Sequence, residues 1–153
     1  MVVINNYDEY RAFEGKVIGI SDWHKIDQKQ INVFADATLD HQWIHIDEEK
    51  AKKEGPFKST IAHGYLTISL IPYLWKQIVD VRNVKMEINY GIENIKFGEP
   101  VLVNDEICLE VKLKSIVNLR GVIKVIISAN MKIKDKPKSA YTGDVVFLYH
   151  FND

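Results

Sequence analysis

The second half of the chain contains four runs in which apolar and polar residues alternate, and this pattern restricts the fold more than any other feature. The runs span residues 84–97, 101–117, 121–134 and 139–151. In the second run, one face carries Ile107, Leu109, Val111 and Leu113, whereas the other carries Glu106, Glu110, Lys112 and Lys114. Alternation of this kind, rich in β-branched residues and broken by short turns, predicts an antiparallel meander with one covered face. A further strand over residues 16–21 is expected to join this sheet.

The segment 61–80 supplies the expected cover for that face. From Tyr65 to Val79 it is apolar on almost every side, which is typical of a helix buried on several sides. Pro72 lies inside it and is expected to kink this helix. One buried helix wrapped by one antiparallel sheet is an α+β architecture.

Two shorter helices are expected before this segment. Asp27 can cap a helix that runs through Ala37, with Gln30 at the capping-box position. Asp47 can cap a second helix, which Gly55 and the proline after it end.

Length and composition predict one domain over residues 1–153. Lysine and arginine number 20 against 21 aspartate and glutamate, a net charge of −1, so we expect no nucleic-acid partner. The lone Cys108 is typical of a reducing compartment and is expected to be buried and inert. The longest uncharged run, residues 64–75, is too short for a membrane span, and no targeting signal precedes it. We therefore expect a cytoplasmic protein without a membrane partner.

Residues 34–47 concentrate groups that can carry chemistry, with three carboxylates and two imidazoles in fourteen positions. Asp40 and His45 are five residues apart, so their side chains can converge on one water molecule only across a break in the helix. Farther along, His63 and Gly64 open the apolar helix. Free backbone N–H groups at such a helix start can stabilise a developing oxyanion.

These motifs resemble those of the MaoC-like dehydratases of the hotdog superfamily, which include (R)-specific enoyl-CoA hydratases. The matching stretches are FADATLDHQWIHID and GPFKSTIAHGYLTISLIP, supported by NYGIENIKFGEPVLVNDEI and KDKPKSAYTGDVVF. The similarity is greatest to the nodulation-protein-N-like branch and covers nearly the whole chain. It implies a single hotdog domain.

The resemblance implies a reaction and roles for particular residues. Asp40 and His45 match the catalytic pair of the family, and Gly64 matches its oxyanion-site glycine. The implied reaction is reversible hydration of a trans-2-enoyl thioester to an (R)-3-hydroxyacyl thioester, carried by CoA or by an acyl-carrier protein. No cofactor or metal is expected, and the implied assembly is a homodimer or a dimer of dimers.

The sequence departs from the family pattern around the catalytic pair. Leu39 replaces the usual glycine, and because a positive φ would cost leucine about 1–2 kcal/mol, we predict a negative φ there. Gln42 and Trp43 replace the Asn-Pro pair of the better-known hydratases, as in the nodulation-type branch. Beside the catalytic pair, Trp43 would narrow the acyl pocket.

Other polar and aromatic residues have simpler interpretations. His63 is expected to form a pocket wall or a structural hydrogen bond, with direct catalysis as the less favoured alternative. His24, Asp36 and His41 are expected at the surface. The imidazoles lack the spacing of a helical zinc site, and no cysteine accompanies them. The aromatic residues Tyr65, Tyr73 and Trp75 of the apolar helix are assigned to the core. For Tyr65, contact with the ligand is the alternative.

Two other functions compete with hydration. Hotdog folds also support thioesterases, which would need a water or carboxylate placed to attack the thioester carbonyl rather than C3. A noncatalytic acyl-thioester binding module is the third hypothesis, favoured by Leu39 and the Gln42-Trp43 pair. A hydratase requires Asp40 and His45 within reach of one shared water, beside the Gly64 N–H.

Overall fold

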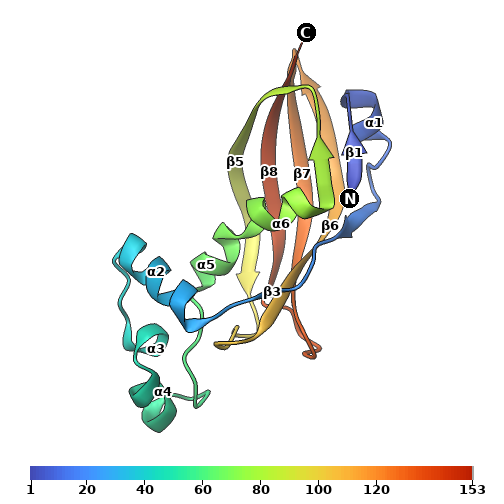
Figure 1. Ribbon diagram of the computed structural model, residues 1–153. Helices are drawn as coiled ribbons and strands as arrows, with labels where there is room; N and C mark the ends of the chain where they lie inside the picture. The colour runs from blue at the N-terminus through green and yellow to red at the C-terminus, as the bar shows by residue number, and fades with distance from the viewer. Residues whose placement is uncertain (153) are drawn as a thin grey trace.

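A computed structural model describes residues 1–152, and its main feature is a strongly curved antiparallel sheet (Figure 1). Its four long strands are β5 (Val84–Phe97), β6 (Glu106–Leu119), β7 (Val122–Ile133) and β8 (Tyr141–Phe151). Two short strands, β2 (Val17–Ile20) and β3 (His24–Lys25), pair with β6. The alternation of the sequence therefore located every long strand, and the α+β architecture is confirmed.

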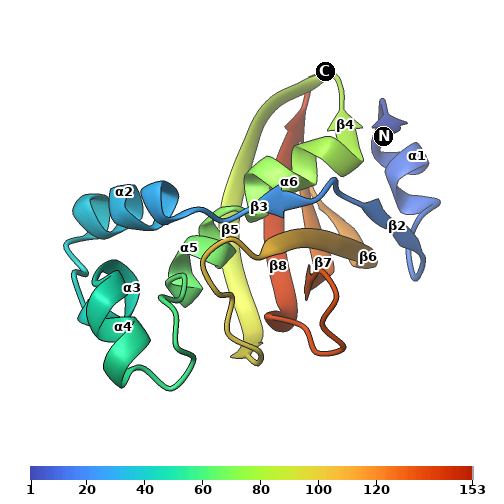
Figure 2. The same ribbon diagram turned by 60° about the horizontal axis from the view of Figure 1, so that its bottom comes forward.

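The strand order differs from the predicted meander. The sheet runs β2-β6-β7-β8-β5, so β5 pairs with β8 rather than with β6, the next strand along the chain. Residues 98–105 thus connect one edge strand to the opposite side of the sheet (Figure 2). Alternation defines which residues of a strand face the core, but not which neighbour the strand chooses. The prediction of a meander is right for β6, β7 and β8 only.

The apolar segment forms two helices instead of one. They are α5 (Gly64–Ser69) and α6 (Ile71–Ile78), followed by strand β4 (Val79–Val81), which pairs in parallel with β1 (Val2–Ile4). Pro72 lies in the first turn of α6, where the N–H that proline lacks would have no intrahelical acceptor. The predicted kink is therefore a helix boundary.

Helix α6 crosses the concave face of the sheet and closes the core (Figure 2). Trp75 is buried, stacks on Phe147 of β8 and donates its indole N–H to the Tyr149 hydroxyl at 3.1 Å. Tyr10 of α1 (Tyr7–Arg11) lies edge-on to Tyr149. The assignment of Trp75 to the core is confirmed, but Tyr65 and Tyr73 are exposed and lie outside the core.

Cys108 has the predicted environment. It is fully buried in β6, and burial raises the pKa of its thiol. A raised pKa disfavours the nucleophilic thiolate, which agrees with an inert role.

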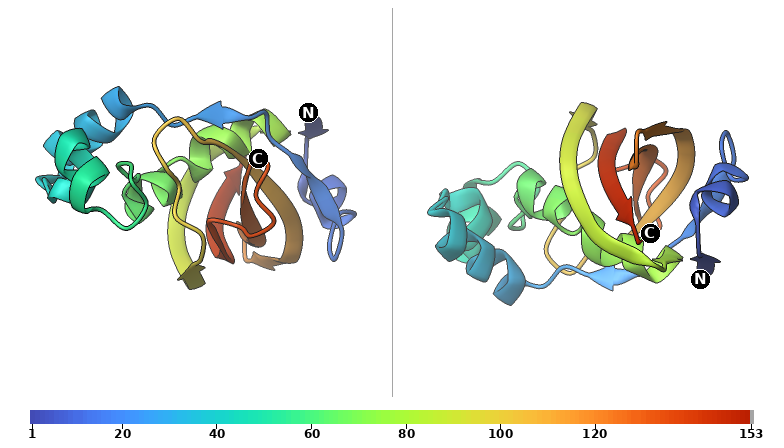
Figure 3. Two further views of the ribbon diagram at one scale, coloured as in Figure 1. Left: turned by 90° about the horizontal axis from the view of Figure 1, so that it is seen from below. Right: turned by 90° about the horizontal axis from the view of Figure 1, so that it is seen from above.

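Three helices form an arm at the side of the sheet where β5 lies (Figures 1 and 3). This helical arm comprises α2 (Gln28–Thr38), α3 (Trp43–Ile46) and α4 (Glu48–Glu54). Asp27 and Asp47 cap α2 and α4 as predicted, each accepting a backbone N–H three residues on. The capping box is incomplete, because the Gln30 side chain bonds His24 instead.

Within residues 1–152, no helix combines the length and apolar character needed to cross a membrane.

Candidate active site

The helical arm and the start of α5 meet around a cavity of about 320 Å³. The loop between α2 and α3 contributes Asp40, α3 contributes His45, and the segment before α5 contributes His63. The remaining lining comes from Ile61, Ala62, Gly64, Tyr65, Thr67, Phe97, Gly98, Glu99, Pro100, Val101 and Ala140. The fold thereby brings the carboxylate of Asp40 and the imidazole of His45 together with the imidazole of His63, which is distant in the sequence.

His45 is buried and its ring is fixed in one tautomer. Its Nδ1 lies 2.7 Å from the carbonyl oxygen of Ile61. Because a carbonyl only accepts hydrogen bonds, Nδ1 carries the proton of the neutral ring and Nε2 is left as a bare acceptor. Burial lowers the pKa of His45, with His63 adding to the effect, while the Ile61 bond and the Asp40 charge oppose it. The ring is therefore favoured in its neutral, basic form.

Asp40 lies at the mouth of the cavity with its side chain half exposed. Its Oδ1 is 3.4 Å from the Gln42 N–H, and its backbone carbonyl accepts a hydrogen bond from His63 Nε2 at 3.0 Å. The carboxylate consequently retains free acceptor positions toward the cavity. This geometry allows Asp40 to accept a hydrogen bond from a bound water.

The prediction for Leu39 is wrong, because its φ is 63° and its ψ is 20°, in the left-handed region. Leu39 follows the last residue of α2, at the position where a left-handed residue commonly ends a helix. Its side chain is 81% exposed, so the unusual backbone produces no steric conflict with the core. The turn reverses the chain and directs Asp40 back toward His45.

His63 is 2% exposed and packs directly on the catalytic candidates. Its ring stacks on that of His45 with centroids 3.8 Å apart, and Phe34 of α2 covers it at 5.0 Å. Since Nε2 donates to the Asp40 carbonyl, Nδ1 is unprotonated in the neutral ring. That buried Nδ1 has no hydrogen-bond partner among the residues the structure describes. The predicted structural hydrogen bond is therefore present, and it joins His63 to the Asp40 backbone.

Asp40, His45 and His63 also form the single group of potential metal ligands found over residues 1–152. One donor atom from each lies within 4.8 Å of the others. However, His45 Nδ1 and His63 Nε2 already bond backbone carbonyls. A cation would have to use His45 Nε2, the same atom that a general base requires.

Gly64 is the first residue of α5, and its N–H has no acceptor among the hydrogen bonds of residues 1–152. A Cβ on Gly64 would lie 2.6 Å from the Phe97 ring, so any larger residue here would have to displace that ring. The free N–H lines the same cavity as His45. This arrangement leaves a donor available to a ligand oxygen.

The two aromatic candidates, Tyr65 and Trp43, differ in their relation to the cavity. Tyr65 lines the cavity but is 72% exposed, and Phe97 lies edge-on to it. Trp43 is not among the lining residues; Lys50 lies over its ring, 4.8 Å from the centroid. The structure therefore gives no direct support to the prediction that Trp43 narrows the cavity.

Two of the predicted surface residues are joined by a hydrogen bond. His41 Nε2 contacts Asp36 Oδ1 at 2.9 Å, and both side chains are solvent-exposed, as expected. His24 is partly buried rather than fully exposed, since it bonds Gln30 and packs on Tyr73.

Sequence reasoning missed Phe97, which covers Gly64, and Gln28, which contacts the His45 backbone. Phe97 ends β5, and the strand pattern gave no sign that this end lies over α5. Gln28 looked like an ordinary first-turn residue of a helix.

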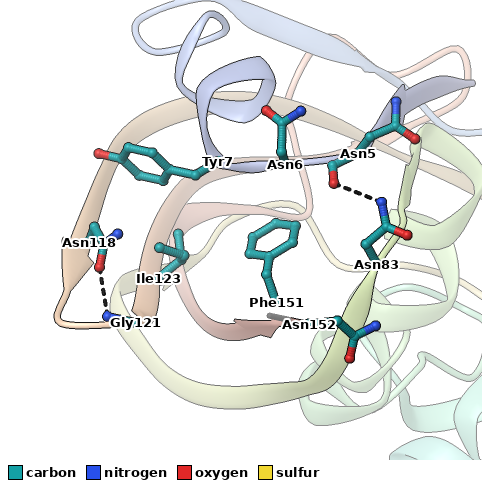
Figure 4. Close-up of a pocket in the computed structure, with 9 residues that line it drawn as sticks. All are labelled: Asn5, Asn6, Tyr7, Asn83, Asn118, Gly121, Ile123, Phe151 and Asn152. Carbon is teal, nitrogen blue, oxygen red and sulfur yellow. Dashed lines mark hydrogen bonds between the residues drawn. The ribbon is translucent and has the colours of Figure 1, made fainter.

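A second cavity lies at the opposite end of the sheet, between the chain start, the β6–β7 turn and the end of β8 (Figure 4). Its lining contains five asparagines but no carboxylate or imidazole. Several asparagines serve local structure: Asn118 accepts the Gly121 N–H at 2.8 Å, and Asn83 donates to the Asn5 carbonyl at 3.1 Å. The acid–base groups are concentrated in the first cavity.

Comparison with known proteins identifies this arrangement. Residues 11–133 match the family model described as "MaoC like domain". The chain belongs to the MaoC-like dehydratase family. Among curated relatives, 3-hydroxyacyl-thioester dehydratase Z of Mycobacterium tuberculosis is 39% identical over 90% of this chain and 91% of its own length. Nodulation protein N of Rhizobium meliloti is 34% identical over 90% and 87%, respectively.

Solved structures confirm the hotdog fold of this MaoC-like chain. An R-hydratase from Pseudomonas aeruginosa superposes with a TM-score of 0.74 at 19% identity, covering 91% of this chain and 83% of that one. A protein described as the monoamine oxidase regulatory protein of Archaeoglobus fulgius gives a TM-score of 0.80 at 21% identity over the full length of both. The chain is thus a MaoC-like hydratase or dehydratase, an enzyme of the hydro-lyase class.

Proposed function

We propose that this enzyme interconverts a trans-2-enoyl thioester and an (R)-3-hydroxyacyl thioester, with Asp40 and His45 as its catalytic pair. One observation carries the proposal: a half-exposed carboxylate and a bare imidazole nitrogen line the same cavity as the free N–H of Gly64. The relative named 3-hydroxyacyl-thioester dehydratase Z supports the choice of thioester substrate.

In this mechanism one water molecule binds between the Asp40 carboxylate and His45 Nε2. As its oxygen bonds to C3, the pair takes a proton from the water, the C2–C3 double bond opens, and C2 receives a proton. The intervening negative charge on the thioester oxygen is stabilised by the Gly64 N–H. General acid–base catalysis contributes about 10²–10⁴-fold and an oxyanion donor about 10²–10³-fold. The step balances without a metal, a redox cofactor or a further reactant.

The acyl carrier is proposed to be CoA or an acyl-carrier protein. The lining of the cavity is largely apolar around Ile61, Phe97 and Val101, which suits an acyl chain. Trp43 lies outside this lining, so Phe97 is the aromatic residue we assign to the acyl side of the cavity.

The test is hydration of crotonyl-CoA and of a longer trans-2-enoyl-CoA, followed at the enoyl absorbance. We expect turnover by the wild type and a loss of 10²–10⁴-fold in kcat for Asp40→Asn. Asp36→Asn is the matched control, because Asp36 is an exposed carboxylate four residues away whose side chain, within residues 1–152, hydrogen-bonds His41 alone. Incubation with a chelator should leave the activity unchanged.

Other outcomes would favour the competing functions. Rapid release of free CoA would make the enzyme a thioesterase. Binding of both substrates without turnover would favour a noncatalytic acyl-thioester module, and the left-handed Leu39 beside Asp40 would then be the first residue to change.

We further propose that residues 1–153 form one domain that works as a homodimer. Strand β5 is a sheet edge, and several of its apolar side chains are about half exposed or more: Met86, Tyr90, Ile92 and Phe97. A long apolar edge is normally covered, and a second copy of the chain would cover it symmetrically. A dimer of dimers is the larger alternative. The buried free thiol of Cys108 supports a cytoplasmic location.

A further inference from the structure

The His45 ring is held by a chain segment that is itself anchored to the body of the protein. Ile61 accepts the Nδ1 proton of His45, and its own N–H donates to the Ile44 carbonyl at 3.1 Å. On the other side, Val103 donates to the Thr60 carbonyl and Ala62 donates to the Val101 carbonyl. Residues 60–62 therefore connect the helical arm to the loop that leads into β6.

The Gln28 side chain completes this connection from the first turn of α2. One amide N–H donates to the His45 carbonyl at 2.7 Å, and the other donates to Asn32 Oδ1 at 2.9 Å. The amide oxygen accepts the hydroxyl of Thr60 at 2.5 Å. A single amide thus joins α2, α3 and the segment before α5.

The chemistry of these contacts specifies the side chains. The group at position 28 must donate to one carbonyl and accept from one hydroxyl at the same time, which an amide can do and a carboxylate or an alkyl group cannot. Thr60 is fully buried, so its hydroxyl depends on Gln28 for an acceptor. Neither residue lines the cavity, so neither is placed to touch substrate.

We propose that Gln28 and Thr60 are positioning residues that hold His45 in the orientation and tautomer required of the base. Gln28 fixes the backbone of His45, and Thr60 fixes both the Gln28 amide and the neighbouring carbonyl that selects the ring tautomer. The inference rests on the proposed function, because it assigns a purpose to the proposed base.

The variants Gln28→Leu and Thr60→Val remove the polar contacts with little change in volume. We expect kcat to fall about 10–100-fold in each, with KM within threefold of the wild type, because substrate contacts are unaltered. Thr60→Ser keeps the hydroxyl and should restore at least a third of the wild-type kcat. Gln30→Leu is the matched control, since Gln30 is a glutamine on the same helix turn whose side chain, in the described part of the chain, hydrogen-bonds His24 alone.

A second readout does not depend on turnover. Nitrogen-15 NMR of labelled histidine reports which ring nitrogen of His45 carries the proton. We expect the Nδ1–H form in the wild type, Thr60→Ser and Gln30→Leu, and a mixture of tautomers in Thr60→Val and Gln28→Leu. The other titratable side chains that face the His45 ring are Asp40 and His63, and both are unchanged in all four variants.

The two readouts separate the two proposals. If no enoyl thioester reacts, the proposed function fails, yet the tautomer measurement still decides whether Gln28 and Thr60 hold the ring. The positioning role is overturned if Thr60→Val keeps the Nδ1–H tautomer, or if Gln30→Leu loses it to the same extent. Thermal melting identifies any variant that has unfolded. If Thr60→Val or Gln28→Leu has unfolded, the comparison of Thr60→Ser with the wild type remains as the test. Loss of the Nδ1–H tautomer in Thr60→Ser contradicts the positioning role.

Discussion

Leu39 shows how one residue can position a proposed catalytic group at a cost to stability. Its left-handed backbone turns the chain between α2 and α3, and this turn brings Asp40 to the cavity. The same conformation costs an L-residue about 1–2 kcal/mol, a cost that glycine avoids. The sequence could not reveal this, because the cost argued against a positive φ whereas the end of a helix favours one.

Replacing Leu39 with glycine should therefore stabilise the protein. Relief of the left-handed strain is partly offset by the greater flexibility of glycine in the unfolded chain, and the exposed leucine side chain contributes little burial. We expect the free energy of unfolding to rise by about 0.5–1 kcal/mol in urea titrations. A decrease would show that the Leu39 side chain makes a stabilising contact, for example across a subunit interface.

His45 gives the protein a pH dependence whose sign can be stated. Its pKa in the folded state lies below the ordinary value of 6.5, so the unfolded chain binds the proton more tightly. The contribution of His45 to stability is therefore complete above about pH 6.5 and is lost as the pH falls toward the lowered pKa. We expect the slope of unfolding free energy against pH in this window to decrease in His45→Gln. The acid limb of kcat/KM should likewise lie below pH 6.5, and a limb above that value would contradict the neutral, buried ring.

At the scale of elements, helix α2 links a predictable feature to an unpredictable one. Its N-cap, Asp27, was evident from the sequence and is confirmed by a 2.8 Å bond to the Gln30 N–H. The neighbouring Gln28 was not recognised, because its two partners outside α2 lie seventeen and thirty-two residues away. A helix cap is determined by a few adjacent residues, whereas hydrogen bonds between distant segments depend on the whole fold.

Loss of the N-cap should weaken both the helix and the site. For Asp27→Ala we expect a decrease of about 0.5–2 kcal/mol in unfolding free energy, because the Gln30 N–H loses its acceptor. Activity should fall as well, since α2 carries Gln28 at its first position. Lys29→Ala, an exposed change in the same turn, is the control, and urea titration with a parallel hydration assay makes the measurement. Equal stabilities of the two variants would argue against the capping role.

In the sheet, too, the sequence predicts local structure but not the contacts between distant segments. Each long strand was located from its alternation, but the pairing of β5 with β8 was not. The predicted helix over 61–80 was divided at Leu70, because the first turn of a new helix accommodates Pro72 better than a kink does. Pairing partners and helix boundaries are decided by tertiary contacts that no single segment encodes.

At the scale of the whole molecule, the exposed edge of β5 is the feature that calls for a partner. Its exposed apolar side chains extend from Met86 to Phe97, and Phe97 also lines the catalytic-site cavity beside the exposed Tyr65. An obligate contact of this kind should bury well over about 1,000 Å².

A charge in the middle of this edge should separate the subunits. We expect Ile92→Lys to convert a dimer of about twice the chain mass into a monomer in light-scattering measurements. Val33→Lys, a matched change at an exposed residue of α2, tests whether the helical arm takes part in the same interface. A wild-type protein that is monomeric at micromolar concentration would refute the proposal.

The pairing of β5 with β8 also sets the order in which the enzyme can be built. All proposed catalytic atoms lie within the first 64 residues, yet Phe97, which covers Gly64, lies opposite Tyr141, the first residue of strand β8. Tyr141 in turn donates its hydroxyl to the Thr67 carbonyl of α5. A nascent chain that has not reached residue 141 therefore holds the catalytic groups without the strand that supports them. The proposed catalytic residues are synthesised early but can act only after β8 has folded, so activity indicates that the last long strand is in place.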